Sequence, residues 1–443
     1  MRWNALYRQK RSSASDRRTL WPGTGNSVMR VAVIGAGVAG LAAARELGRH
    51  RVRVTLLEES PRVGGCVRAV SVGDTHLEVG PRFFHRFRRG PKAALRRAVR
   101  ASGFRPVDDD GFEYYLIEGA LHEDESASNH PAMREAVRLR NNPQLLARAF
   151  ETASPASKDT LDALYGAEYG ILPENMDGEE LAAAEAYREG AELVGFDRPL
   201  SEVLTAALVP AGASVLTEHS VTSVAPLSAS GSAPRVSVVA DNGGETATEV
   251  FDGVVLAVPP ASAARVLAPS VDTRPLEALD SLTNRGCYLS TIAVFDEVSA
   301  VELPGTVVAD GGAGVAYFPT TIAAAEIKTP CNGVPNNAGE AEATRAVVDR
   351  FCRLLGARTA RFVETSMFEK RSTVPSAGGA AARSAVPDFL DGEGRIVCAG
   401  EAYHKGGGFA CLTGAAETGV AAAGRLFSSI RAGGGKSSAG GRH

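Results

Sequence analysis

Residues 30–58 read RVAVIGAGVAGLAAARELGRHRVRVTLLE, and this stretch decides the fold. Val31–Ile34 is a short apolar run typical of a buried strand, and Leu41–Leu47 has the composition of a helix. Val52–Leu57 predicts a second buried strand, which ends at Glu58. A strand, a helix and another strand in this order form a βαβ unit, which is the building block of a parallel sheet.

The turn between the first strand and the helix has the pattern Gly-x-Gly-x-x-Gly. Gly35 permits a tight turn, Gly37 lets a pyrophosphate approach the backbone, and Gly40 lets helix and strand pack closely. Glu58 follows Gly40 by 18 residues, near the spacing of about 20 that is typical of an acid binding ribose hydroxyls. A packed glycine turn without a ligand is the alternative, but strand, helix and acid together favour a dinucleotide site. The expected contacts of the turn are Gly35, Gly37, Val38, Ala39 and Gly40.

Composition excludes several other classes of protein. The 443 residues contain 48 Lys+Arg and 51 Asp+Glu, and this balance disfavours a nucleic-acid binder. The longest apolar and glycine-rich run, Val31–Ala44, has 14 residues and is too short to span a membrane. The 6 cysteines form no CxxC pair, so neither a disulfide scaffold nor a cysteine zinc site is expected.

Both ends of the chain resemble extensions. Residues 1–29 are rich in Arg and Ser and contain one acid, Asp16, which suits either a disordered tail or a plastid or mitochondrial transit peptide. We expect a cytoplasmic protein in the first case and an organellar one in the second. Residues 431–443 are rich in Gly and Ser and are expected to be disordered.

Further strands predict a sheet that is assembled from distant segments. Arg235–Ala240 and Val250–Val258 are strand candidates joined by the turn Asp241–Gly244, and Thr291–Phe295 and Arg395–Ala399 are two more. Helices are expected at Lys92–Ala101, Pro143–Ala153, Lys158–Tyr165, Glu179–Glu192, Pro199–Leu208, Glu340–Leu355 and Leu412–Phe427. The expected division is a discontinuous nucleotide-binding domain of residues 30–105, 205–285 and 386–430, with a substrate domain of residues 106–204 and 286–385.

The segment after Glu58 resembles the flavin-containing amine oxidase superfamily. That superfamily includes monoamine and polyamine oxidases, protoporphyrinogen oxidases and phytoene-type desaturases, and it joins the glycine turn and the acid to an Arg-x-Gly-Gly loop beside the flavin. The matching residues here are Glu58, Glu59, Arg62, Gly64 and Gly65. Many members carry a second Arg after the paired glycines, where this chain has Cys66.

Three further blocks are similar to the superfamily. Glu78-Val-Gly-Pro-Arg82 resembles a segment at the flavin ring, and Val221 matches a valine that contacts adenine through its backbone. Gly400-Glu401 resembles the acid that binds ribityl or ribose hydroxyls, and the helix from Leu412 is the one that approaches the flavin pyrimidine edge. The cofactor contacts that the resemblance adds are Gly80, Pro81, Arg82, Val221, Gly400, Glu401 and Leu412.

The resemblance implies an α/β fold with a discontinuous Rossmann-like FAD-binding domain and an inserted α+β substrate domain. It implies an FAD-dependent oxidoreductase that removes a hydride from a C–H bond of a small molecule onto flavin N5, with molecular oxygen as a possible oxidant of the reduced flavin. A protoporphyrinogen oxidase-like or carotenoid desaturase-like enzyme for a larger apolar substrate is one alternative. A non-catalytic flavin-binding protein is the other.

Several superfamily residues are replaced in this chain. Ser290 stands at the position of a lysine near flavin N5, while Cys411 and Ala381 stand at those of the aromatic amine cage. The cysteine that tethers flavin in some members corresponds to Ala380, so the resemblance implies non-covalent FAD. The chain lacks HExxH, P-loop and GxSxG motifs, which leaves metalloprotease, kinase and serine hydrolase readings without support.

Other polar and aromatic residues are weaker candidates. A basic patch around His85 suits an acidic substrate or a phosphate, although a solvated loop is favoured. His404 and Lys405 are candidates to face the flavin, and Tyr403 and Phe409 to line a substrate pocket. The arginines of the patch are Arg82, Arg86, Arg88 and Arg89.

Overall fold

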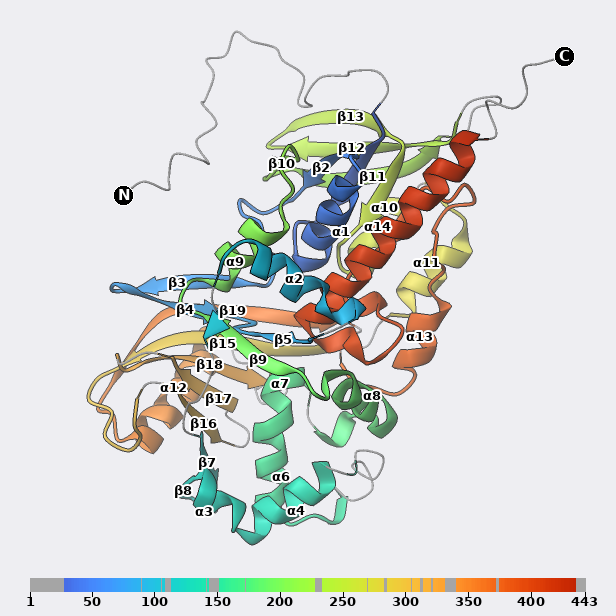
Figure 1. Ribbon diagram of the computed structural model, residues 1–443. Helices are drawn as coiled ribbons and strands as arrows, with labels where there is room; N and C mark the ends of the chain where they lie inside the picture. The colour runs from blue at the N-terminus through green and yellow to red at the C-terminus, as the bar shows by residue number, and fades with distance from the viewer. Residues whose placement is uncertain are drawn as a thin grey trace, which may run out of the picture.

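The computed structural model of the chain describes residues 28–435, apart from residues 89, 105, 108–112, 141, 143–150, 172, 228–232, 269, 283–284, 304, 311–313, 320–321, 331–339 and 372–373. A five-stranded parallel sheet organises the upper part of the molecule in Figure 1. Its strand order is β10 (Ser214–Leu216), β2 (Arg53–Leu57), β1 (Arg30–Ile34), β14 (Gly253–Leu256) and β20 (Ile396–Cys398). Strands from three distant stretches of sequence therefore form one sheet.

The central strands of this sheet are buried on both faces because their side chains alternate between two apolar cores. Val31 and Val33 of β1 belong to one core, whereas Ala32 and Ile34 belong to the other. The first core is covered by α1 (Val38–Arg49), α2 (Ala94–Ala101), α9 (Leu200–Leu208) and α14 (Leu412–Gly435). Figure 1 shows α14, in red, running beside the blue helix α1.

The second core lies between the parallel sheet and an antiparallel sheet of three strands. These strands are β11 (Ser220–Leu227), β12 (Arg235–Asn242) and β13 (Glu245–Phe251), and helices α10 (Pro260–Leu267) and α11 (Thr273–Asp280) pack beside them. The prediction of one strand over Val250–Val258 is wrong. The chain turns at Asp252, so β13 ends in the antiparallel sheet and β14 begins in the parallel one.

A seven-stranded sheet forms the second half of the molecule. Its order is β19 (Ala360–Arg371), β15 (Arg285–Phe295), β18 (Ala324–Pro330), β17 (Gly314–Phe318), β16 (Thr306–Asp310), β7 (Glu113–Ile117) and β8 (Ala120–Glu123). Helix α12 (Glu340–Leu355) packs on one face, and the hairpin of β3 (Arg68–Val72) and β4 (Thr75–Val79) on the other. Helix α9 crosses the expected domain boundary at residue 205, and the division itself stays a prediction.

Short helices and strands fill the space beside and below this sheet in Figure 1. The helical segments are η1 (Pro91–Ala93), α3 (Asp124–Ser128), α4 (Pro131–Arg140), α6 (Pro155–Leu161), η3 (Asp162–Gly166), α7 (Ala167–Tyr169), η4 (Pro173–Asn175), α8 (Gly178–Arg188) and α13 (Gly379–Ala385). Strand β9 (Glu192–Phe196) pairs with β5 (Phe84–Arg86) and β6 (Pro106–Val107). The helix predicted over Glu179–Glu192 ends early, because Gly190 has a φ of 70° and starts the turn into β9.

The two ends differ in what the structure describes. Helix α14 runs to Gly435, so residues 431–435, which were expected to be disordered, are helical. Residues 1–27 and 436–443 lie outside the described residues. Most of the helix expected over Pro143–Ala153 also lies outside them. Among the described helices, none is long and apolar enough to cross a bilayer. Cys287 is disulfide-bonded, which the cysteine spacing did not predict.

Candidate dinucleotide-binding site

A cavity of about 570 Å³ lies at the carboxyl ends of β1, β2, β14 and β20. Parallel strands present their ligand sites at this edge, because the following loops and helix N-termini converge there. The lining joins residues that are far apart in sequence. Of the predicted contacts, it includes Gly35, Gly37, Val38, Ala39, Glu58, Glu59, Gly64, Gly65, Val221, Gly400, Glu401 and Leu412.

The first glycine turn needs glycine at two positions for packing reasons. Gly35 has a φ of 93°, and a Cβ there would lie 2.4 Å from the carbonyl oxygen of Ala257. A Cβ on Gly40 would lie 1.9 Å from the carbonyl oxygen of Gly35, so helix and turn touch as predicted. A Cβ on Gly37 would meet only Gly65 Cα, at 3.9 Å, so space stays open above the backbone of Gly37.

The second glycine loop lies directly against the first. The N–H of Gly64 donates a hydrogen bond of 2.9 Å to the carbonyl of Ala36, and Gly37 and Gly64 form a parallel β-bridge. Arg62, an expected cofactor contact, does not line the cavity, and its contact with the cofactor stays a prediction. Its guanidinium donates to the carbonyl oxygens of Gly65 at 3.0 Å and Val67 at 3.3 Å, so it fixes the shape of the loop.

Glu58 lies at the end of β2, is 9% exposed and faces the cavity. One carboxylate oxygen accepts the N–H of Ala36 at 2.7 Å, and the other accepts the N–H and hydroxyl of Ser60 at 3.0 and 2.7 Å. These bonds hold the acid against the glycine turn. Each carboxylate oxygen offers two acceptor sites, so Oε2 can also accept a hydrogen bond from a ribose hydroxyl.

The late segment closes the cavity from the other side. Gly400 has a φ of 140°, and its N–H donates to the hydroxyl of Thr418 at 3.0 Å, which ties the turn after β20 to α14. Leu412 and Ala415 in the first turn of α14 line the cavity, so the N-terminal end of this long helix faces it. A helix N-terminus carries partial positive charge and favours an anionic group.

The remaining wall holds residues that the sequence did not single out. Pro259 to Ser262 at the start of α10, together with Arg265 and His219, line the cavity beside Val221. The His219 ring nitrogen Nδ1 lies 2.7 Å from the carbonyl of Thr217. Pro260 stands at the first position of α10, and proline at this position is a sequence signal for a helix start.

Gly80, Pro81 and Arg82 do not line the cavity, which differs from the expected flavin contacts. Gly80 instead donates its N–H to the buried carboxylate of Glu326 at 2.7 Å, and the hydroxyl of Ser290 donates to the same oxygen at 2.6 Å. Arg82 stacks on the ring of Tyr317, with its guanidinium carbon 4.1 Å from the ring centroid. This segment thus packs on the seven-stranded sheet.

The sheet face under Gly80 carries a cluster of charged and phenolic groups. Lys328 lies 3.7 Å from the other oxygen of Glu326 and near the rings of Tyr288 and Tyr317. Burial, together with Cys66, Glu326 and Glu401, raises the pKa of Tyr288 well above its ordinary value. Because Cys66 and Glu401 line the cavity, the cluster adjoins it.

A buried carboxyl, Glu78, belongs to the same region. Its Oε1 accepts the N–H of Leu200 at 2.6 Å at the start of α9, while its Oε2 is buried without a hydrogen-bond partner. Burial raises the pKa of Glu78 to about 8, and the nearby Glu326 adds to this effect. Sequence reasoning missed Glu326, Lys328 and both tyrosines, because no local pattern marks residues that meet only across strands.

The basic patch expected around His85 is divided in the structure. Arg86 and Arg88 both bind Glu192 on β9, at 2.7 and 2.6 Å, while Arg82 lies on Tyr317; Arg89 is outside the described residues. Burial, with a contribution from Arg188, lowers the pKa of His85 to about 4. The arginines therefore do not form a common anion site.

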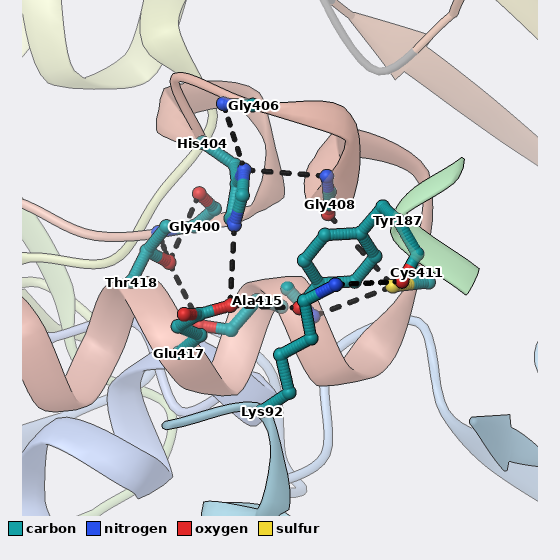
Figure 2. Close-up of polar contacts among 11 residues, drawn as sticks. Lys92, Tyr187, Gly400, His404, Gly406, Gly408, Cys411, Ala415, Glu417 and Thr418 are labelled. Atoms are coloured by element: carbon teal, nitrogen blue, oxygen red, sulfur yellow. Dashed lines mark hydrogen bonds and ion pairs between the residues drawn. The ribbon is translucent and has the colours of Figure 1, made fainter. Parts of the chain in front are cut away.

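Other candidates take different positions. Tyr403 lines the cavity, whereas Phe409 is fully buried under Arg383. His404 does not line the cavity; Figure 2 shows it between the 406–408 turn and Glu417 of α14. The residues at the replaced superfamily positions are scattered: Ser290 and Cys411 are buried, and Ala380 and Ala381 are exposed on α13.

An extended dinucleotide fits the features of this cavity. The open space above Gly37, the positive φ angles of Gly64 and Gly65, and the N-terminus of α1, which begins at Val38, provide a backbone cradle for phosphates. Two acids of the lining, Glu58 and Glu401, suit hydroxyl-bearing groups. Fold and cavity together define a protein with a Rossmann-like dinucleotide-binding domain and a second, sheet-based half.

Known proteins support this class. The family model of the NAD(P)-binding Rossmann-like domain matches residues 33–99. A mitochondrial protoporphyrinogen oxidase of Nicotiana tabacum is 54% identical over 46 residues, which are 10% of this chain and 9% of that protein. An L-amino-acid oxidase of Crotalus adamanteus is 48% identical over 52 residues, which are 12% of this chain and 10% of that protein. The chain thus matches about a tenth of the length of these curated relatives.

Two solved structures are similar to this chain over nearly its whole length. A cyclohexylamine oxidase from Brevibacterium oxydans superposes with a TM-score of 0.66 at 16% identity, over 91% of this chain and 100% of the other. A redesigned putrescine oxidase gives the same TM-score, identity and coverage. The chain therefore has the fold of these two amine oxidases, as the resemblance implied.

Proposed function

We propose that this protein is an FAD-dependent oxidoreductase that removes a hydride from a C–H bond next to an amine nitrogen of a small molecule. The observation that carries the proposal is that the Gly35–Gly40 turn, the Gly64–Gly65 loop and Glu401 meet around one cavity. A nicotinamide cofactor needs only the first of these. FAD, bound without a covalent link, supplies the hydride acceptor, and oxygen is the proposed terminal oxidant.

Residues of the chain then provide orientation and electrostatic support. Glu58 holds ribose hydroxyls, the backbone of Gly37 and Gly64 carries the phosphates, and Glu401 orients the ribityl chain. The N-terminal turn of α14 places partial positive charge beside the ring system, where negative charge develops during the reaction. Burial of the surrounding groups excludes water from the reacting atoms.

The charged cluster beside the cavity favours a small polar substrate over a polyene or a porphyrin. We propose that Glu326, Lys328 and the Arg82–Tyr317 stack border the substrate, where a large apolar molecule would instead require apolar walls. Desolvating such charges against an apolar molecule would cost free energy. On this basis we propose an amine or amino acid in preference to the substrates of the desaturase-like and protoporphyrinogen oxidase-like alternatives.

A visible-absorption spectrum tests the proposal. The purified protein, reconstituted with FAD, should show bound flavin, and one compound of an anaerobic panel of amines, amino acids, tetrapyrroles and polyenes should bleach it. Admission of air should restore the colour and yield hydrogen peroxide. A protein that binds no FAD would contradict the proposal. Bound flavin that no compound reduces would support the non-catalytic alternative.

A further inference from the structure

A polar network joins His404 to the cavity wall. His404 follows η6 (Glu401–Tyr403), and its Nδ1 accepts the N–H groups of Gly406 at 3.1 Å and Gly408 at 3.2 Å. Since Nδ1 accepts both bonds, the ring proton of the neutral imidazole lies on Nε2, which is 3.3 Å from Oε2 of Glu417. Figure 2 shows the ring held between the glycine turn and α14.

The same network includes α8 and the segment before α2. The hydroxyl of Tyr187 donates to the same oxygen of Glu417 at 2.8 Å, and the hydrogen bond from His404 is the main cause of a lowered pKa of Glu417. Lys92 donates to the carbonyl of Tyr187 at 2.8 Å and lies 3.9 Å from the centroid of its ring. Glu417 therefore stays anionic and accepts from two elements at once.

The 406–408 turn, which His404 holds, packs against the first turn of α14. A Cβ on Gly414 would lie 1.9 Å from the carbonyl oxygen of Gly408, so the turn rests directly on the helix start. The thiol of Cys411 donates to the carbonyl of Gly408 at 3.9 Å and accepts the N–H of Gly414 at 3.4 Å. Leu412, between them, lines the cavity.

The structure assigns His404 the role of a positioning residue that, in its neutral form, holds the 406–411 turn and the start of α14 against the cofactor cavity. Protonation of Nδ1 would turn the acceptor of two N–H groups into a donor that faces them. The hydrogen bonds from Gly406 and Gly408 would be lost. The contact between His404 and Glu417 would become an ion pair, which adds little stability because both side chains are partly exposed. Acidification therefore loosens the turn and weakens FAD binding; this inference rests on the proposed function.

The titratable and charged groups around His404 come from several elements. They are Glu417 on α14, Tyr187 on α8, Lys92 in η1, Cys411 at the end of the turn, and the adjacent Lys405, which pairs with Asp388 at 3.4 Å. Burial raises the pKa of the Cys411 thiol and of the Tyr187 phenol, which keeps both neutral.

Binding of FAD to the apoprotein, followed by flavin fluorescence at several pH values, tests this role. We expect the dissociation constant of the wild type to rise about tenfold between roughly pH 8 and pH 5.5, as two hydrogen bonds are lost. The His404→Asn variant keeps an acceptor on the γ-carbon and does not titrate, so its FAD affinity should be near that of the wild type at high pH and independent of pH. The His404→Ala variant should bind FAD weakly throughout.

Controls separate this inference from the proposed function. His122→Asn alters a histidine on β8, outside the cavity lining, and should retain the wild-type profile. If the wild type binds no FAD at any pH, the proposed function fails. If the wild type binds FAD but His404→Ala binds it equally well, or His404→Asn keeps the pH dependence, only the role of His404 is overturned. Should His404→Ala not fold, the profile of His404→Asn still decides.

Discussion

The backbone N–H of Gly80 donates a hydrogen bond of 2.7 Å to the carboxylate of Glu326, and this bond joins the end of β4 to the second sheet. Glu326 is 2% exposed and also accepts the hydroxyl of Ser290 at 2.6 Å. A segment expected to contact the flavin is thus held by an acid that the sequence did not mark. The acid links the cofactor-binding half to the sheet of the proposed substrate side.

Removal of this acid should destabilise the protein. Glu326→Ala leaves the N–H of Gly80 and the hydroxyl of Ser290 buried without an acceptor, and Lys328 without its carboxylate. We expect the free energy of unfolding in urea to fall by ~3 kcal/mol. Glu326→Gln keeps the accepting oxygen, so it should lose less. Equal losses in both variants would show that the charge, and not the hydrogen bonds, stabilises this contact.

Two glycines of the first turn should respond differently to alanine. At Gly40 the new Cβ would lie 1.9 Å from the carbonyl oxygen of Gly35, so α1 must shift and the free energy of unfolding should fall by ~1–3 kcal/mol. At Gly37 the Cβ enters open space, so Gly37→Ala should fold normally but lose FAD affinity at least tenfold, as flavin fluorescence can measure. Gly424→Ala, with no atom within 4 Å, is the control and should change neither quantity adversely. A Gly37→Ala variant with unchanged affinity would contradict the placement of the phosphates.

The sequence predicted the parts of the site that depend on local backbone geometry. Gly35, Gly40 and Glu58 could be placed because a tight turn, a close helix contact and a strand-end acid each have a fixed spacing. The fold of the amine oxidases followed from the same blocks, and the structural similarity confirms it. Contacts between backbone groups, such as the hydrogen bond from Gly64 to Ala36, depend on the same local geometry.

Contacts between distant side chains were not predictable in this way. Lys328 pairs with Ser290 across β15 and β18, and this register depends on strands whose order no local pattern encodes. Arg62 was expected at the cofactor, yet its reach to the carbonyls of Gly65 and Val67 depends on how the loop closes. His404 was a candidate to face the flavin but does not line the cavity, and its partner Glu417 lies on the following helix, facing a turn whose shape the sequence leaves open.

A buried ion pair beside Phe409, next to the 406–408 turn, should also be important for stability. Arg383 on α13 and Glu180 on α8 form a hydrogen-bonded pair, and the guanidinium carbon lies 4.1 Å from the centroid of the Phe409 ring. Because Arg383 is 1% and Glu180 6% exposed, Arg383→Met should leave a buried carboxylate without its cation and cost ~3–5 kcal/mol in urea unfolding. Combined with Glu180→Leu, it should recover much of that loss. A double variant less stable than Arg383→Met would refute this explanation.

Glu78 predicts a stability difference that depends on pH. Its pKa is about 8 in the folded protein, above the ordinary value of 4.5, chiefly because of burial. The folded state then retains a proton that the unfolded chain has lost, so stability falls as the pH rises from 4.5 towards 8. Glu78→Gln keeps an oxygen that can accept the N–H of Leu200 and cannot ionise. It should therefore be more stable than the wild type near pH 8, by an amount that shrinks to nearly nothing towards pH 4.5.

Urea unfolding of both proteins across this pH range measures the difference directly. Glu202→Gln, an exposed position on the same helix α9 that Glu78 contacts, is the matched control and should give a nearly constant difference. A carbonyl-stretch infrared band of a protonated carboxylic acid at neutral pH, absent in Glu78→Gln, would identify the proton independently of stability. If the band is missing in the wild type and the two stability curves run parallel, Glu78 is ionised and water must reach its Oε2.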